Sequence, residues 1–155
     1  QFCFYKEGPM LNILFQLTAA FIGTVSFSIL FSTPNKYLPQ CGLIGAMGWG
    51  VYLLTLHLAG SSVAAIFAAS AILTICSRYL ARFYKVTTTL FLISGIFTLV
   101  PGAGIYYTAY YTIIGPAQTA FYYGMLSLKT ALAIGLGIGV AYSLPPKLFG
   151  WKKRS

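Results

Sequence analysis

Residues 98–116, TLVPGAGIYYTAYYTIIGP, have the apolar and aromatic composition of a membrane-spanning helix, with Pro-Gly-Ala-Gly set inside it. A proline inside a helix removes a hydrogen bond and clashes with the preceding turn, at a cost of about 3 kcal/mol. A bilayer holds no water that could replace the lost hydrogen bond. The place of this break in the fold therefore decides how the chain is organised.

The rest of the chain is as apolar as this stretch. Of its 155 residues, 58% are hydrophobic and 7% are charged, whereas soluble domains carry about 25% charged residues. The sequence therefore predicts an all-α integral membrane protein. The net charge of +9 lies at the ends of apolar runs, so we expect no nucleic-acid partner. Glu7 is the only acidic residue of the chain.

Five apolar segments are long enough to cross a bilayer as helices, which takes about 20 residues each. We expect a single transmembrane domain over residues 1–155, with the third helix continuing through RYLARFY (78–84), and with spans at about 10–31, 41–58, 62–77, 88–114 and 125–144. The chain begins at Gln1, and the apolar run after it is too long for a signal-peptide core. We therefore expect that the N-terminus is either trimmed or produced by cleavage of a longer precursor.

The basic residues predict the orientation. With five spans, the loops after the first and third spans share one side with the C-terminal tail. This side holds eight of the ten basic residues, namely Lys36, Arg78, Arg82, Lys85, Lys147, Lys152, Lys153 and Arg154. Because basic residues gather in cytoplasmic loops, we expect the N-terminus outside and the C-terminus in the cytoplasm.

Small residues recur at helical spacing in three of the spans. The second span has Gly42, Ala46 and Gly50, the third is rich in alanine, and the fifth has Gly135 and Gly139 as GxxxG. Small residues at this spacing let helix backbones approach closely. Two interpretations stay open, namely close packing within the chain and an oligomer interface.

Two ionisable groups lie near the outer ends of the expected spans. His57 is either an interfacial histidine or a functional group, and Lys129 is either a snorkelling lysine or a cation that faces an anionic substrate. The cysteines Cys3, Cys41 and Cys76 are scattered and are expected to be unpaired thiols. No Ser/His/Asp set, metal-ligand cluster or carboxylate pair is present. We therefore expect no enzyme, no cofactor and no metal.

The break divides the fourth span, which is longer than a straight helix requires. Pro101 ends a first half-helix, and a second half-helix restarts at Ile105 with free N–H groups and a positive dipole end. Broken helices of this kind direct their N-termini at anionic substrates in transporters, although a simple proline kink is the alternative. Tyrosines at helical spacing follow the break. The predicted substrate-binding residues are Pro101, Gly102, Ala103, Gly104, Tyr106, Tyr110 and Lys129.

Two blocks of the sequence resemble the threonine/serine exporter (ThrE) family. They are FSTPNKYLPQCGLIGAMGWGVYLL (31–54) and SRYLARFYKVTTTLFLISGIFTLVPGAGIYYT (77–108), and the resemblance extends over roughly residues 10–148. It is to the smaller C-terminal half of the family, which also exists as a separate YjjB-like subunit. This resemblance implies a bacterial inner-membrane exporter of small amino acids, or of dicarboxylates such as succinate in some split members. It also implies a complex with a larger YjjP-like membrane subunit. Because five spans are few for a complete carrier, a homo-oligomer is the other expectation.

The sequence departs from the family pattern at four positions. Ser94 and Thr98 stand where prolines are frequent, and Ser77 and Pro116 stand where acidic residues are expected. The resemblance therefore implies that any proton-carrying carboxylates lie on a partner chain. Three functions stay open: a transporter subunit that binds a small carboxylate-bearing solute, an assembly subunit without a substrate path, and a passive channel.

Overall fold

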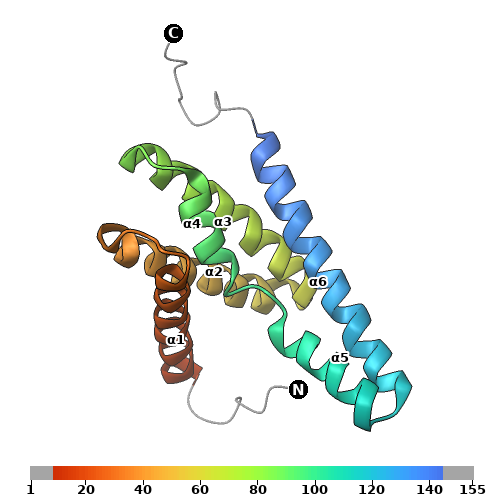
Figure 1. Cartoon of the computed structure of the whole chain (residues 1–155). Coiled ribbons are helices and arrows are strands. Elements are labelled where there is room, and N and C mark those ends of the chain that lie inside the picture. Colours follow the sequence, from red (N-terminus) through yellow and green to blue (C-terminus); the bar gives the residue numbers. More distant parts are fainter. Residues whose placement is uncertain (1–8, 145–155) are drawn as a thin grey trace.

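A computed structural model of the chain describes residues 9–144, which are helical apart from short connections (Figure 1). Glu7, Lys6 and the basic residues from Lys147 onward, on which part of the predicted orientation rests, lie outside this range. The elements are α1 (Pro9–Leu30), the 3-10 helix η1 (Asn35–Tyr37), α2 (Leu38–Ala59), α3 (Ser62–Tyr84), α4 (Thr88–Ile96), α5 (Gly102–Ile114) and α6 (Ala117–Ser143).

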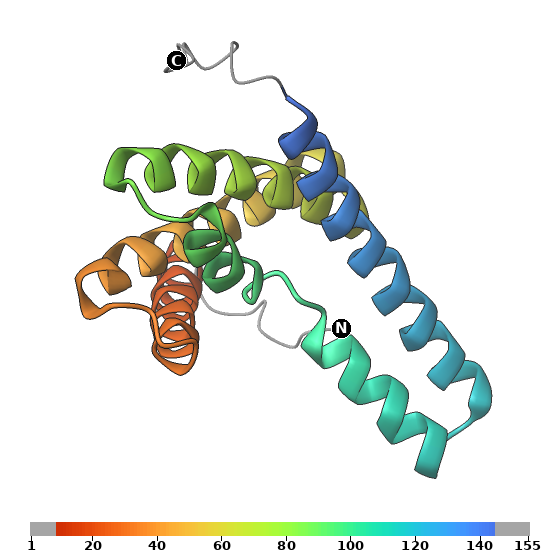
Figure 2. The ribbon, with the colours of Figure 1, turned by 45° about the horizontal axis from the view of Figure 1, so that its top comes forward.

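The helices form a body and an arm. In the body, α2 packs between α1 and α3, α4 packs against α2 and α3, and α6 packs against α3. Helix α5 packs mainly against α6. Figures 1 and 2 show that α5 and the N-terminal half of α6 extend together past the start of α3 and form a helical hairpin outside the body.

The prediction of apolar helices is confirmed, with corrections to their bounds. Four described helices, α1, α2, α3 and α6, are long and apolar enough to cross a membrane. Helix α2 begins at Leu38 rather than near Cys41, because Pro39 fits the first turn of a helix. Helix α6 begins at Ala117 rather than near Met125, since the turn at Gly115-Pro116 is enough to start it.

The segment expected as the fourth span comprises two helices, α4 and α5. Helix α4 ends at Ile96 rather than at Pro101, and α5 begins at Gly102 rather than at Ile105. The reason is that the turn is complete once the Gly102 amide donates to the Val100 carbonyl.

Small residues bring the helices of the body close together. A Cβ on Gly42 would lie 2.6 Å from the ring of Phe21 on α1, and a Cβ on Gly48 would lie 2.6 Å from Leu73 on α3. On α6 the close contact is at Gly137, whereas Gly135 and Gly139 have open space around them. Packing within the chain therefore accounts for the glycines of α2, but no residue within 9–144 lies against the GxxxG glycines of α6.

Buried hydroxyl groups bond to their own helices. Each donates to the carbonyl oxygen three or four residues earlier, at 2.7–3.0 Å, and these donors are Thr24, Ser28, Ser70, Thr74, Ser94, Ser127 and Thr130. Back-bonding of this kind lets a helix bury a hydroxyl without a partner on another helix. Ser77 differs, because its buried Oγ has no hydrogen-bond partner among the described residues.

Helices α3 and α6 run in the same sense. Near its start α3 shares a groove with Lys129 of α6, and further along Ser70 lies against Gly137. At the far end, Nη1 of Arg78 donates to the carbonyl oxygens of Ala141 and, at 3.4 Å, of Leu144. The last four carbonyls of a helix have no partner inside it. Arg78 therefore caps the C-terminus of α6 from the neighbouring helix.

Replacing Arg78 with glutamine is expected to destabilise the contact between α3 and α6. A hydrogen bond to a charged group contributes about 1.5–3 kcal/mol, and Arg78 also lies over the ring of Tyr142, at 5.4 Å. Thermal unfolding of the purified protein in detergent should therefore show a lower midpoint for Arg78→Gln. The control is Lys85→Gln, which removes one positive charge at the end of α3. Equal midpoints for the two variants would refute the capping role.

Candidate functional site

The break between α4 and α5 is a hydrogen-bonded turn. After α4 ends at Ile96, the amides of Thr98 and Leu99 donate to the carbonyls of Gly95 (3.3 Å) and Ile96 (2.8 Å). Pro101 then adopts φ −76° and ψ 57°, and the amide of Gly102 donates to the Val100 carbonyl at 2.8 Å. This is the geometry of an inverse γ-turn. Local hydrogen bonds therefore pair many of the backbone N–H and C=O groups that a broken membrane helix would leave without a partner.

The two glycines of the break differ in their surroundings. A Cβ on Gly102 would meet nothing within 4 Å, but a Cβ on Gly104 would collide with the hydroxyl of Ser127 on α6. Gly104 therefore lets α5 approach α6. The amide of Gly102 is used by the turn, and helix geometry provides no acceptor for the amides of Ala103 and Gly104. Of the three amides predicted to bind an anion, those of Ala103 and Gly104 thus remain able to donate a hydrogen bond to one.

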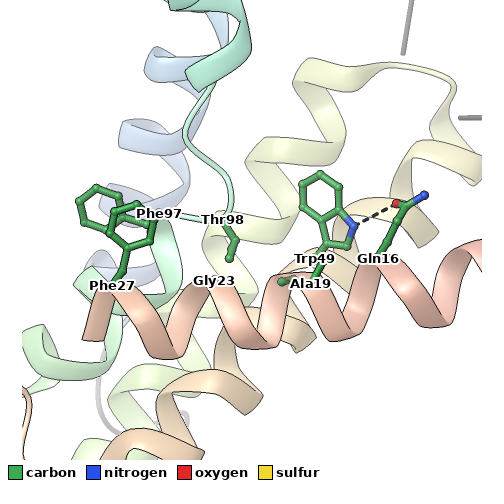
Figure 3. A pocket seen from close by; sticks show the side chains of 8 residues that line it. Gln16, Ala19, Gly23, Phe27, Trp49, Phe97 and Thr98 are labelled. Carbon is green, nitrogen blue, oxygen red and sulfur yellow. Dashed lines mark hydrogen bonds between the residues drawn. The ribbon is translucent and has the colours of Figure 1, made fainter. Parts of the chain in front are cut away.

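An open groove of about 280 Å³ lies between α1, α2 and the residues that follow α4. One face of α1 forms its floor, and Trp49 of α2 and the start of the break form its walls (Figure 3). The lining residues are Gln16, Ala19, Ala20, Gly23, Phe27, Trp49, Phe97 and Thr98. A Cβ on Gly23 would meet nothing within 4 Å, so this glycine leaves the centre of the floor open.

The groove combines aromatic walls with a few positioned polar groups. Nε1 of Trp49 donates to Oε1 of Gln16 at 3.1 Å, as Figure 3 shows. This bond orients the Gln16 amide and leaves its NH₂ group as a donor. The Thr98 hydroxyl donates to the Gly95 carbonyl at 2.7 Å, and its oxygen remains an acceptor. The groove therefore suits a small polar solute that both accepts and donates hydrogen bonds.

Stacked rings close one end of this groove. Phe27 of α1 and Phe97 of the break stack with centroids 4.6 Å apart and an interplanar angle of 11°. Phe31 lies against the same Phe97 ring at 5.2 Å. These contacts hold the break against α1, so a shift of the α4–α5 connection would change the shape of the groove.

The tyrosines after the break pair as their spacing predicts. Tyr106 and Tyr110 stack with centroids 6.2 Å apart, and Tyr107 and Tyr111 stack at the same distance. Tyr107 and Tyr111 also lie against Tyr123 of α6, at 5.2 and 5.7 Å, and so join α5 to α6. Tyr106 and Tyr110 are 64% and 42% exposed. Neither of them lines the groove beside α1.

The remaining polar candidates lie apart from the break. Lys129 is exposed on α6 and lines a separate groove against the start of α3. His57 is exposed in the last turn of α2. Of the residues predicted to form one substrate site, Pro101, Gly102, Ala103 and Gly104 lie together at the break, and Lys129 does not join them.

Sequence reasoning missed the polar floor of the groove. Gln16 is a carboxamide in a helix whose other polar residues are Asn12, near its start, and hydroxyl-bearing side chains, and a carboxamide within an expected span is a signal that could have found it. Trp49 had no comparable signal, because tryptophan is common in membrane helices. Their hydrogen bond joins residues 33 positions apart, a contact that periodicity within one helix cannot indicate.

Comparison with known proteins gives one family, through a family model. The family model described as "Threonine/Serine exporter, ThrE" matches residues 16–144. A protein of Haemophilus influenzae described as "Uncharacterized protein" is 29% identical over 97 residues, which are 63% of this chain and 33% of that relative. The chain thus matches about a third of the length of this curated relative. No solved structure matches the chain.

Proposed function

The chain belongs to the threonine/serine exporter family, and from this membership we propose that it is a subunit of a bacterial inner-membrane exporter of small amino acids such as threonine and serine. The family is one of transporters rather than of enzymes. Together with the four helices that are long and apolar enough to cross a membrane, membership makes the chain a multi-pass membrane protein. The subunit role, the bacterial membrane and the substrates are the proposal.

We propose that α4 and α5 together make a fifth crossing, interrupted at the break. Helices α3 and α6 run in the same sense, so the chain that joins the end of α3 to the start of α6 must return toward the side on which both begin. Helix α4 has 9 residues and α5 has 13, and a crossing takes about 20. The basic loops then give an external N-terminus and a cytoplasmic C-terminus.

The groove beside the break is the proposed solute site. The observation that carries this proposal is the hydrogen bond by which Trp49 fixes the Gln16 amide at one end of a groove walled by the break itself. In this site the Gln16 NH₂ would donate to the solute carboxylate, and Thr98 Oγ1 would accept from its ammonium group. We propose that the amides of Ala103 and Gly104 offer the carboxylate a second position, with Tyr106 and Tyr110 on the outward wall.

A neighbouring subunit is proposed to close the groove, because its open side would otherwise face lipid. This neighbour is either a second copy or a larger YjjP-like subunit. The exposed Gly135 and Gly139 offer a place for close helix contact. Since the described residues contain no carboxylate side chain, we propose that any proton-carrying carboxylates lie on the partner.

The test is uptake of labelled solutes into inside-out membrane vesicles from cells that produce the full gene product. Threonine and serine are expected to accumulate against a gradient. Gly102→Leu is expected to reduce the initial rate about tenfold, equivalent to about 1.4 kcal/mol of lost binding. The added side chain lies beside the amides of Ala103 and Gly104, in space that the fold leaves open.

Other outcomes separate the alternative functions. Accumulation of succinate in place of threonine and serine would make the chain part of a dicarboxylate exporter. Equilibration without accumulation would make it a passive channel. An assembly subunit without a substrate path would tolerate Gly102→Leu, whereas Gly135→Leu would break its complex. As the control, immunoblots of the vesicles should show that each variant is inserted in the same amount as the wild type.

A further inference from the structure

A second groove lies where α6 passes the start of α3. It has a volume of about 450 Å³ and is separate from the groove beside the break. Its lining residues are Ser61, Val63, Ala64, Phe67, Lys129, Leu132, Ala133 and Leu136. Because α3 and α6 run in the same sense, Ser61 and Lys129 lie at one end, and Phe67 and Leu136 lie further along.

The polar end of this groove carries an isolated positive charge. Lys129 is exposed, and the sequence has no other charged residue between Lys85 and Lys147. Glu7, the only acidic side chain of the chain, lies outside the described residues. No carboxylate side chain within residues 9–144 can therefore neutralise Lys129. A lone lysine close to a bilayer favours an anionic partner.

The rest of the groove is apolar and continues from the charged end. Val63, Ala64 and Phe67 of α3 face Leu132 and Leu136 of α6 along its length. Leu132 and Leu136 are 59% and 63% exposed, so the part of the chain that the structure describes does not cover them. The groove thus has a cation at one end and apolar side chains along the rest of its length. A lipid has the same arrangement, with a charged head group and an apolar acyl chain.

We propose that this groove binds an anionic phospholipid, with the phosphate on Lys129 and an acyl chain along α3 and α6. A small zwitterion such as threonine could meet the charge but would leave the apolar length of the groove empty. Lys129 is thus assigned to a lipid site rather than to the solute site. This assignment does not depend on the proposed transport function.

The test measures lipid binding to the purified full-length protein in detergent by native mass spectrometry. Phosphatidylglycerol and phosphatidylcholine with identical acyl chains are the probes. Wild-type protein should retain phosphatidylglycerol more strongly, and Lys129→Gln should weaken that binding about fivefold, the effect expected of one basic residue near an anionic lipid. Lys85→Gln, which removes one charge elsewhere on the molecule, should bind as the wild type does.

A second pair of variants tests the apolar part of the groove. Leu136→Gln should weaken retention of both lipids, whereas Leu128→Gln, also on the exposed surface of α6 but outside this groove, should leave it unchanged. Equal phosphatidylglycerol binding by the wild type and Lys129→Gln would overturn the proposal. Displacement of the lipid by glycerol phosphate at equal concentration would also overturn it, because it would show a site for the head group alone. Loss of transport with intact lipid binding would refute only the solute site.

Discussion

Gly137→Ala is expected to destabilise the protein more than any other exchange of a glycine for alanine in α6. A Cβ at this position would collide with the Ser70 hydroxyl and lie 2.7 Å from the carbonyl oxygen of Phe67. The carbonyl belongs to the backbone of α3, so it cannot rotate away. Overpacking of this kind costs about 1–3 kcal/mol, and the unfolding midpoint of a chain of this size should fall by about 5–10 °C.

The same helix provides the controls. Gly135 and Gly139 lie one turn apart on the opposite side of α6, and a Cβ on either would meet nothing within 4 Å. Gly135→Ala and Gly139→Ala should leave the midpoint unchanged or raise it slightly, because alanine favours a helix more than glycine does. Ser70→Ala should not rescue Gly137→Ala, since the Phe67 carbonyl remains in place. A rescue, or equal midpoints for all three glycine variants, would contradict this view of the contact between α3 and α6.

This contrast shows what a sequence motif can and cannot predict. The GxxxG pattern pointed to Gly135 and Gly139, but the glycine that packs inside the chain is Gly137, which lies between them. A small-residue motif indicates that a backbone can be approached closely. It does not say which neighbour approaches, because that depends on the rotation of the helix against its partners.

Helix bounds were predictable where the chain carries a clear stop. The lengths of the apolar segments predicted α1 and α3. Helix α2 ends at Gly60, whose φ of 63° is a left-handed conformation that glycine adopts at little cost. The start of α6 was predicted too late. Residues 117–124 are rich in tyrosine and contain a glycine, which resembles an interfacial loop, yet packing against α5 keeps them helical.

The candidate site was only partly predictable for a similar reason. The sequence located the turn at Pro101, because proline and glycine act on their own backbone. It could not place Lys129. This residue lies two positions after Ser127 on α6, so it faces α3 while Ser127 faces α5. Nor could it bring Gln16 to Trp49, because a contact between helices depends on how the two helices pack.

Filling the groove beside the break is expected to slow transport strongly without unfolding the protein. Gly23→Leu places a side chain in the centre of the floor, where a Cβ meets nothing within 4 Å. The Gln16 amide would then be cut off from Phe27 and Thr98 at the other end of the groove. We expect the initial rate of threonine uptake into inside-out vesicles to fall by about tenfold or more, with an unchanged unfolding midpoint.

Three companion variants make this prediction specific to the groove. Ser26→Leu adds similar bulk to an exposed position of α1 outside the groove and should transport as the wild type does. Gly23→Ala, which adds one methyl group, should show an intermediate rate. Gln16→Leu keeps the volume but removes the amide, so it should raise the KM for threonine more than it lowers kcat. Wild-type transport by Gly23→Leu at equal abundance would exclude this groove from the solute path, because the added side chain occupies the centre of its floor.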